Sequence, residues 1–251
     1  MRSILYFVVL MIIWRGLVRA ADRESYHNDP IATYDQRQIH GFTVLVSRRL
    51  LDRPAEAGPS LRELDRQLGR IASVVPAQPL GELRQVRIWL ERAETAGLGE
   101  FHWGREPLVA MGRNPAKARC VEVTNARHLV EWSTTQPWAV LHELAHAYHC
   151  VILGKDDPAL LRAYDRAMKS ERYDRVAYTQ GGARVAYAKN NPPEYFAELT
   201  EAYFGRNDFE PFHRADLARF DPPGHQLMVD VWGIPASGEN PVEIAPRMRN
   251  N

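Results

Sequence analysis

The stretch LHELAHAYHC, residues 141–150, places three histidines and one glutamate among apolar residues. Within it, His142-Glu-Leu-Ala-His146 fits the pattern H-E-x-x-H. Residues four apart on a helix lie one above the other, so the two imidazoles can converge on one zinc ion. Glu143 would then lie beside the open coordination position, where it can take a proton from an activated water and pass it to a leaving amine.

The third ligand of such a site must come from elsewhere in the chain. His149 lies about 10 Å along the helix axis from His142, which is too far for all three histidines to reach one ion. We therefore interpret His149 as a hydrogen-bonding group near the ligands, a surface group or a packed histidine.

Three glutamates, Glu194, Glu198 and Glu201, form one carboxylate face on a second helix expected over residues 190–205. This helix is the obvious supplier of the third ligand. Other interpretations stay open. Glu194 follows Asn191 by three residues, as in a capping box, where its carboxylate would bond to the N-cap amide and touch no metal. Glu198 and Glu201 also fit an ordinary solvated face.

Together these motifs carry a resemblance. HELAHAYH is followed by Tyr187, six further residues and then Glu194-Tyr-Phe-Ala-Glu198. This arrangement resembles the anthrax lethal-factor-type metallopeptidases, a group of glutamate-zincins, over residues 137–205. Residues 40–235 are similar in general pattern to uncharacterised secreted bacterial proteins with the same active-site set. The toxin's large accessory domains are absent, so the resemblance implies nothing about its substrate.

The resemblance implies that one catalytic Zn²⁺ is bound by His142, His146 and Glu194, and that Glu143 is the general base and acid. Tyr187 would donate its hydroxyl to the oxyanion of the tetrahedral intermediate.

A further role can be assigned one turn beyond Glu194. Glu198 can accept a hydrogen bond from a ligand imidazole and fix its tautomer.

The N-terminus predicts export. Arg2, an apolar run over residues 4–14, and the small residues Val18 and Ala20 are typical of a secretory signal peptide, cleaved before Ala21. An uncleaved membrane anchor is the alternative, although the run is shorter than the ~20 residues of a spanning helix. We expect the mature protein in the periplasm, at the cell surface or outside the cell, with no membrane span after cleavage.

Composition limits the remaining possibilities. The chain has 251 residues, 45% hydrophobic and 25% charged, which is typical of a globular protein. Cleavage leaves 29 basic and 31 acidic residues, a net charge of −2, so nothing favours nucleic acid or an anionic membrane as a partner. We expect a monomer. The two cysteines, Cys120 and Cys150, could form one disulfide or stay as buried thiols.

Strands in the first half and helices afterwards predict an α+β protein, and the resemblance implies a zincin-like fold. We expect strands over 41–47, 85–91 and 118–124, with a short one near 107–111. Helices are expected over 60–75, with Ser60 as N-cap, from Pro137 to Gly154, after Pro158 and over 190–205, with a last helix or strand near 225–235.

The expected organisation is a signal peptide over 1–20, a polar leader over 21–40, one catalytic domain over 41–235 and a tail over 236–251. The domain would comprise a sheet-containing half (41–135) and a helical half (136–235). The strand CVEV, residues 120–123, would form the sheet edge where an extended peptide binds.

The leading hypothesis is an exported zinc-dependent endopeptidase that acts on a peptide or protein substrate. One alternative is a non-catalytic binding domain that zinc stabilises; another is a metal-dependent amidase acting on cell-wall peptides. Structural zinc sites have four protein ligands, whereas Glu143 is a base and not a ligand. The presence of Glu143 therefore favours a catalytic zinc site over a structural one.

Overall fold

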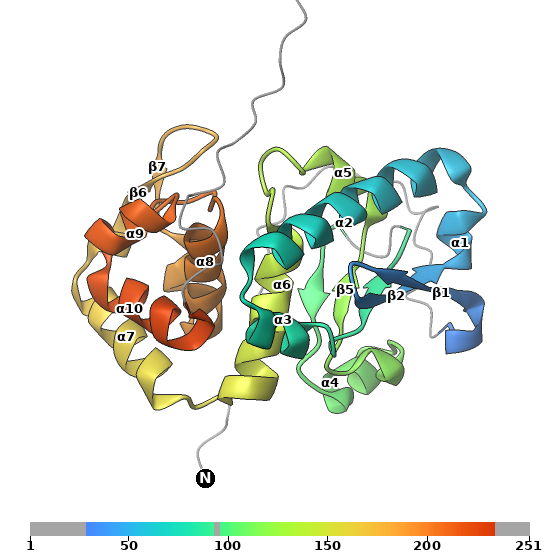
Figure 1. Ribbon diagram of the computed structural model, residues 1–251, viewed down its shortest axis with the longest axis horizontal. Helices are drawn as coiled ribbons and strands as arrows, with labels where there is room; N and C mark the ends of the chain where they lie inside the picture. The colour runs from blue at the N-terminus through green and yellow to red at the C-terminus, as the bar shows by residue number, and fades with distance from the viewer. Residues whose placement is uncertain (1–28, 93–95, 234–251) are drawn as a thin grey trace, which may run out of the picture.

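The computed structural model describes residues 29–92 and 96–233. Figure 1 shows a sheet-containing half with its helices and a second, mainly helical half, with α6 (Ala139–Tyr148) between them. The predicted signal peptide, the first residues of the leader and the predicted tail lie outside the described residues. Within those ranges, no helix has the length and apolar character needed to cross a membrane.

One five-stranded sheet forms the first half, in the order β1-β2-β3-β5-β4. The three inner strands are parallel to one another, and each outer strand is antiparallel to its neighbour. The architecture is therefore a mixed α+β one, as predicted. The strands are β1 (Tyr34–Ile39), β2 (Phe42–Ser47), β3 (Ile88–Leu90), β4 (Glu100–Phe101) and β5 (Val121–Val123).

The two edges of the sheet correct the sequence interpretation. The leader contains β1, which pairs with β2 through a tight turn at Gly41. It is a polar edge strand in which only Tyr34 is buried, so no apolar alternation marks it. The CVEV strand, β5, lies inside the sheet, because β4 covers it. Among the described strands, β4 is the edge strand on the side of the candidate site, and it contacts α6.

The sheet separates two apolar clusters because successive side chains of a strand point to opposite faces. On one face, Val44, Ile88 and Val121 join the main core together with residues of α2 (Pro54–Val74) and α6. On the other face, Leu45 and Trp89 pack in a small cluster.

The long helix α2 packs on the main face of the sheet, and Figure 1 shows it crossing in front of the strands. The helices of this half are α1 (Arg48–Leu51), α2 (Pro54–Val74), α3 (Ala77–Leu83), α4 (Arg105–Ala110) and α5 (Ala126–Glu131). The short 3-10 turns of this half are η1 (Ile31–Thr33) and η2 (Pro115–Lys117).

The helices α1, α3 and α5 were not predicted, and α2 and α4 differ from the elements predicted at their positions. α2 begins at Pro54, and Ser60 is an interior residue whose hydroxyl donates to the Ala126 carbonyl at 2.9 Å. The strand expected near residues 107–111 is the helix α4. Pro107 is tolerated there because it lies in the first turn, where backbone N–H groups have no partner within the helix.

The second half is built around α8, which contacts α6, α7, α9 and α10. Its helices are α6 (Ala139–Tyr148), α7 (Pro158–Lys169), α8 (Pro192–Phe204), α9 (Arg214–Phe220) and α10 (Pro222–Trp232). A π-helical turn, η3 (His149–Leu153), extends α6 to Gly154. The remaining elements are η4 (Arg172–Asp174), β6 (Val176–Ala177), β7 (Ala183–Arg184) and η5 (Tyr187–Lys189).

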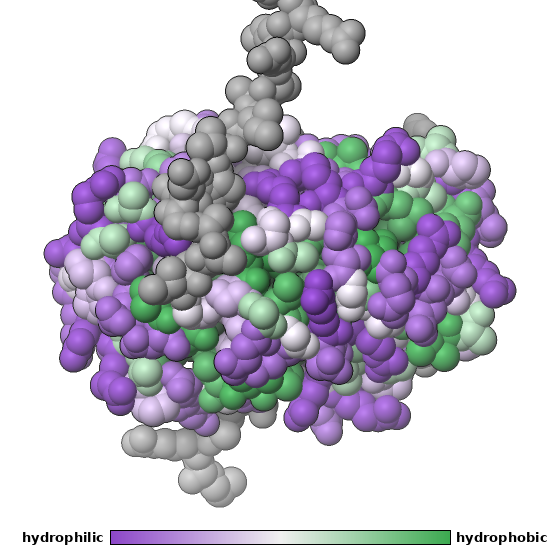
Figure 2. All heavy atoms as spheres, in the orientation of Figure 1, coloured by the Kyte–Doolittle hydropathy of each residue, from purple (hydrophilic) through white to green (hydrophobic). Residues whose placement is uncertain are grey.

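The segment predicted near 225–235 as a helix or a strand is helical as far as Trp232, in α10. On the face shown in Figure 2, hydrophilic residues predominate at the periphery, with apolar residues in patches between them. Cys120 and Cys150 are both free thiols.

Candidate metal centre

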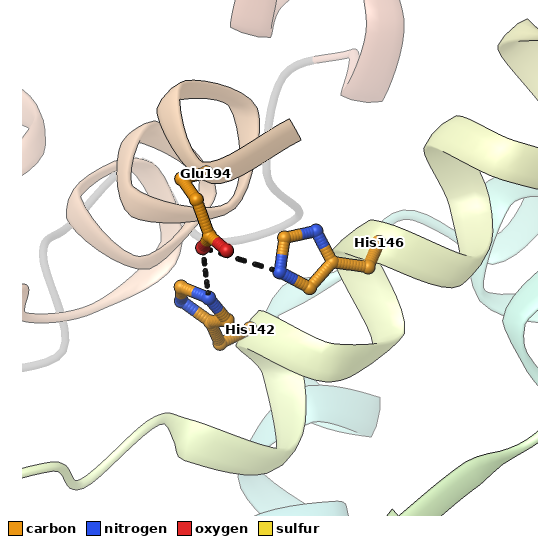
Figure 3. A group of neighbouring side chains, drawn as sticks. All are labelled: His142, His146 and Glu194. Atoms are coloured by element: carbon orange, nitrogen blue, oxygen red, sulfur yellow. Dashed lines mark hydrogen bonds and ion pairs between the residues drawn. The ribbon is translucent and has the colours of Figure 1, made fainter. Parts of the chain in front are cut away.

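Two packed helices bring three of the predicted residues together. His142 and His146 project from α6, and Glu194 projects toward them from the first turn of α8 (Figure 3). Glu194 Oε2 lies 3.1 Å from His142 Nε2 and 3.3 Å from His146 Nε2. The three side chains form a group whose ligand atoms all lie within 4.8 Å of one another.

These separations fit a zinc ion. Zinc binds histidine nitrogen at about 2.0 to 2.1 Å in tetrahedral geometry, so two of its donor atoms lie about 3.4 Å apart. The two distances from Glu194 are close to that value. Two imidazoles and one carboxylate also match a catalytic zinc site, in which three protein ligands leave one position open.

Local sequence explains how Glu194 reaches this position. Asn191 caps α8, and its side-chain oxygen accepts a hydrogen bond from the Glu194 amide at 2.9 Å. Pro192 follows at the first helical position, where it is favoured. The cap thus involves the Glu194 backbone, while the carboxylate faces the histidines.

The three side chains also stabilise one another electrostatically. Burial alone would lower the pKa of His142, but its hydrogen bonds with Glu194 and Glu201 raise it well above its usual value. Burial would likewise raise the pKa of Glu194, and the hydrogen bonds from both histidines lower it instead. Glu194 is therefore an ionised carboxylate at neutral pH, as a metal ligand must be.

Glu201 supplies the carboxylate that is hydrogen-bonded to the outer nitrogen of His142, which is Nδ1, the ring nitrogen away from Glu194. Its Oε1 lies 2.7 Å from His142 Nδ1. Glu198, assigned this role from the sequence, lies 3.9 Å from the same nitrogen, which is beyond hydrogen-bond distance. Glu198 instead accepts a hydrogen bond from the Asn207 side chain at 3.0 Å. The role is therefore reassigned to Glu201, one turn further along α8.

His149 packs away from the ligands. Its ring contacts Trp103 and Phe196, with centroids 5.6 and 5.9 Å away, and burial lowers its pKa. Within the described ranges, no hydrogen bond joins it to the ligand side chains. Of the roles left open for His149, the structure supports that of a packed histidine. His146 Nδ1 is buried and, among the described residues, has no hydrogen-bond partner.

Glu143 and Tyr187 line one cavity with His142. The cavity has a volume of about 280 Å³. Burial raises the pKa of Glu143 above its usual value, and the charges of His146 and His142 offset only part of this shift. Burial and the nearby Glu194 raise the pKa of Tyr187, which keeps the phenol protonated and able to donate.

The β4 edge approaches Glu143 at Gly99. A Cβ on Gly99 would lie 3.6 Å from Glu143 Cγ and 2.9 Å from the Glu122 carbonyl oxygen. Glycine therefore lets the backbone before β4 pass directly beside Glu143.

Several residues of the cavity have no motif to reveal them. Asp208 and the aromatic residues Trp132, Tyr178 and Phe209 all line it. They come from the ends of other elements and from loops, where sequence periodicity carries no signal. Only Glu201 had a visible signal, as part of the carboxylate face of α8.

Comparison with known proteins gives no assignment. No family model, no curated protein and no solved structure matches the chain. Because function resides in sites rather than folds, the chemistry of this centre carries the functional argument.

Proposed function

We propose that the protein is an exported zinc-dependent endopeptidase with a zincin-like fold. The observation that carries this proposal is the convergence of His142, His146 and Glu194 beside a glutamate that is not part of the ligand group. The export component rests on the N-terminal sequence alone.

The roles of the side chains follow from their chemistry. His142, His146 and Glu194 would hold zinc, which supplies Lewis acidity and lowers the pKa of water. Glu143 would accept a proton from the attacking water and deliver it to the leaving amine. Tyr187, whose phenol stays protonated, would donate a hydrogen bond to the oxyanion that develops on the peptide carbonyl. An extended substrate would pair with the outer edge of β4, the last strand of the sheet on this side.

Replacing the base tests this proposal. We expect wild-type protein with zinc to cleave a mixed peptide library, and Glu143→Gln to lower kcat/KM by about 10²- to 10⁴-fold. The zinc content should stay unchanged, because Glu143 is not a ligand. Mass spectrometry of the products and elemental analysis provide the two readouts.

The matched control is Glu106→Gln, a change at an exposed position of α4. It should retain full activity. A wild-type protein that holds one zinc per chain and cleaves no peptide would contradict the peptidase proposal and favour a non-catalytic zinc-stabilised domain.

A further inference from the structure

The cavity beside the metal centre has an acidic side. Glu198 and Glu201 of α8 and Asp208, just beyond it, all line this cavity together with His142. All three carboxylates are buried, with less than a tenth of each residue exposed. Glu198 and Glu201 lie on the side of His142 Nδ1, whereas Nε2 faces Glu194.

The other walls are aromatic. Trp132, Tyr178 and Phe209 line the same space, and the Tyr178 and Phe209 rings lie 4.7 Å apart between centroids. Small residues, Gly99 and Ala139, leave the space open near the base. A volume of about 280 Å³ is just below the range of pockets that hold a small ligand, so it suits one long side chain.

Among the residues that line this cavity, acidic side chains outnumber basic ones. A divalent ion bound by Glu194 would retain one positive charge. Glu143, Glu198, Glu201 and Asp208 bring four carboxyl groups to the same cavity. Neighbouring amides stabilise two of these carboxyl groups: Asn207 donates a hydrogen bond to Glu198, and the Gln136 side chain is hydrogen-bonded to Asp208.

We propose that this cavity binds the side chain of a lysine or arginine in the substrate, next to the bond that is cut. The aliphatic stem would lie against the aromatic walls, and the charged end would pair with Asp208 and Glu198. The Tyr178 ring already packs against one guanidinium group, since Arg184 Cζ lies 4.2 Å from the ring centroid. The proposal rests on the peptidase function for its substrate, but the cavity can be tested without catalysis.

The test compares two ligands that differ in charge and little else. Nα-acetyl-arginine amide and Nα-acetyl-citrulline amide have nearly the same shape, but citrulline is neutral. Isothermal titration of the zinc-loaded full-length protein gives both affinities. We expect the arginine compound to bind about tenfold or more tightly, as buried charge-assisted hydrogen bonds are stronger than neutral ones.

Two variants locate the effect. Asp208→Asn should reduce the preference for arginine to about threefold or less, and Glu198→Gln provides a second, independent test should Asp208→Asn fail to fold. Asp165→Asn, at an exposed position of α7, is the matched control and should keep the wild-type preference.

Equal affinities in the wild type, no binding of either compound at millimolar concentration, or an undiminished preference in the folded variants would overturn the proposal. Loss of cleavage in the peptide library would leave the binding result intact, so the two proposals fail separately. If cleavage occurs, sites flanked by lysine or arginine should be enriched in the wild type and depleted in Asp208→Asn. Cleavage sites without that enrichment would also overturn the proposal.

Discussion

At the residue scale, the orientation of His142 depends on two carboxylates. Glu194 lies at Nε2, and Glu201 lies at Nδ1. A carboxylate at Nδ1 fixes the tautomer that leaves Nε2 free to bind a metal and raises the basicity of the ring. His146 has no such partner within the described residues. The site should therefore depend strongly on Glu201.

Glu201→Ala should weaken zinc binding by about 10- to 100-fold, because His142 loses its outer hydrogen bond. Glu201→Gln should fall between this variant and the wild type, since an amide oxygen can still accept from Nδ1–H. Competition with a chromophoric chelator gives the dissociation constants.

Glu198→Gln provides the comparison, because Glu198 lies 3.9 Å from the same nitrogen. It should change zinc affinity less than Glu201→Ala does. Equal losses in Glu198→Gln and Glu201→Ala would restore the assignment first made from the sequence.

At the element scale, the site requires α6 and α8 to hold a fixed separation. Gly205, directly after α8, lies against the ring of Trp138 at the start of α6. A Cβ at position 205 would lie 1.9 Å from Trp138 Cε2, and that ring is buried. The glycine therefore sets how closely the two helices approach at this end.

Gly205→Ala should destabilise the protein by about 3 kcal/mol or more, because the ring and the backbone must move apart. The melting temperature should fall by roughly 2 to 4 °C for each kcal/mol. Gly81→Ala in α3 is the matched control, since a Cβ there meets nothing within 4 Å. A Gly205→Ala protein as stable as the control would show that the helices tolerate separation.

Local signals predicted α8 well because its ends depend on neighbouring residues, Asn191 at the cap and Gly205 at the end. The same reasoning missed β1, whose burial is confined to Tyr34, and it took α4 for a strand. The choice between Glu198 and Glu201 could not be made from the sequence, because both lie on one helical face. It depends on how far α8 is displaced along α6, which is a tertiary feature.

At the scale of the whole molecule, a buried ionic network lies on the face of the sheet that carries Leu45 and Trp89. Glu122 of β5 accepts hydrogen bonds from His102 at 2.5 Å, Arg113 at 2.7 Å and Lys117 at 2.5 Å. Lys117 also donates to Glu91, at 2.7 Å. Although Glu100, His102 and Glu122 have the spacing of a metal group, the two basic side chains already neutralise Glu122.

Burial would raise the pKa of Glu122, but the His102 hydrogen bond and the charges of Lys117 and Arg113 lower it to about 2. Its contribution to stability is therefore complete above about pH 4.5 and is lost as the pH falls toward 2. Glu122→Gln should cost roughly 1.5 to 3 kcal/mol at pH 6, because Arg113 and Lys117 each lose one of two carboxylate partners.

Urea unfolding at pH 6, 4.5 and 3 measures this effect. The difference in unfolding free energy between wild type and Glu122→Gln should narrow as the pH falls below 4.5. A constant difference across that range would mean that Glu122 does not titrate as its surroundings require.

The most direct test of the metal centre is the zinc content of purified wild-type protein and Glu194→Ala, measured in parallel by elemental analysis. The geometry of α6 and α8 predicts one zinc per chain in the wild type and an affinity at least tenfold weaker in Glu194→Ala. Glu106→Ala, at an exposed position, should match the wild type. Equal zinc in wild type and Glu194→Ala, or no zinc in either, would contradict a centre built from His142, His146 and Glu194.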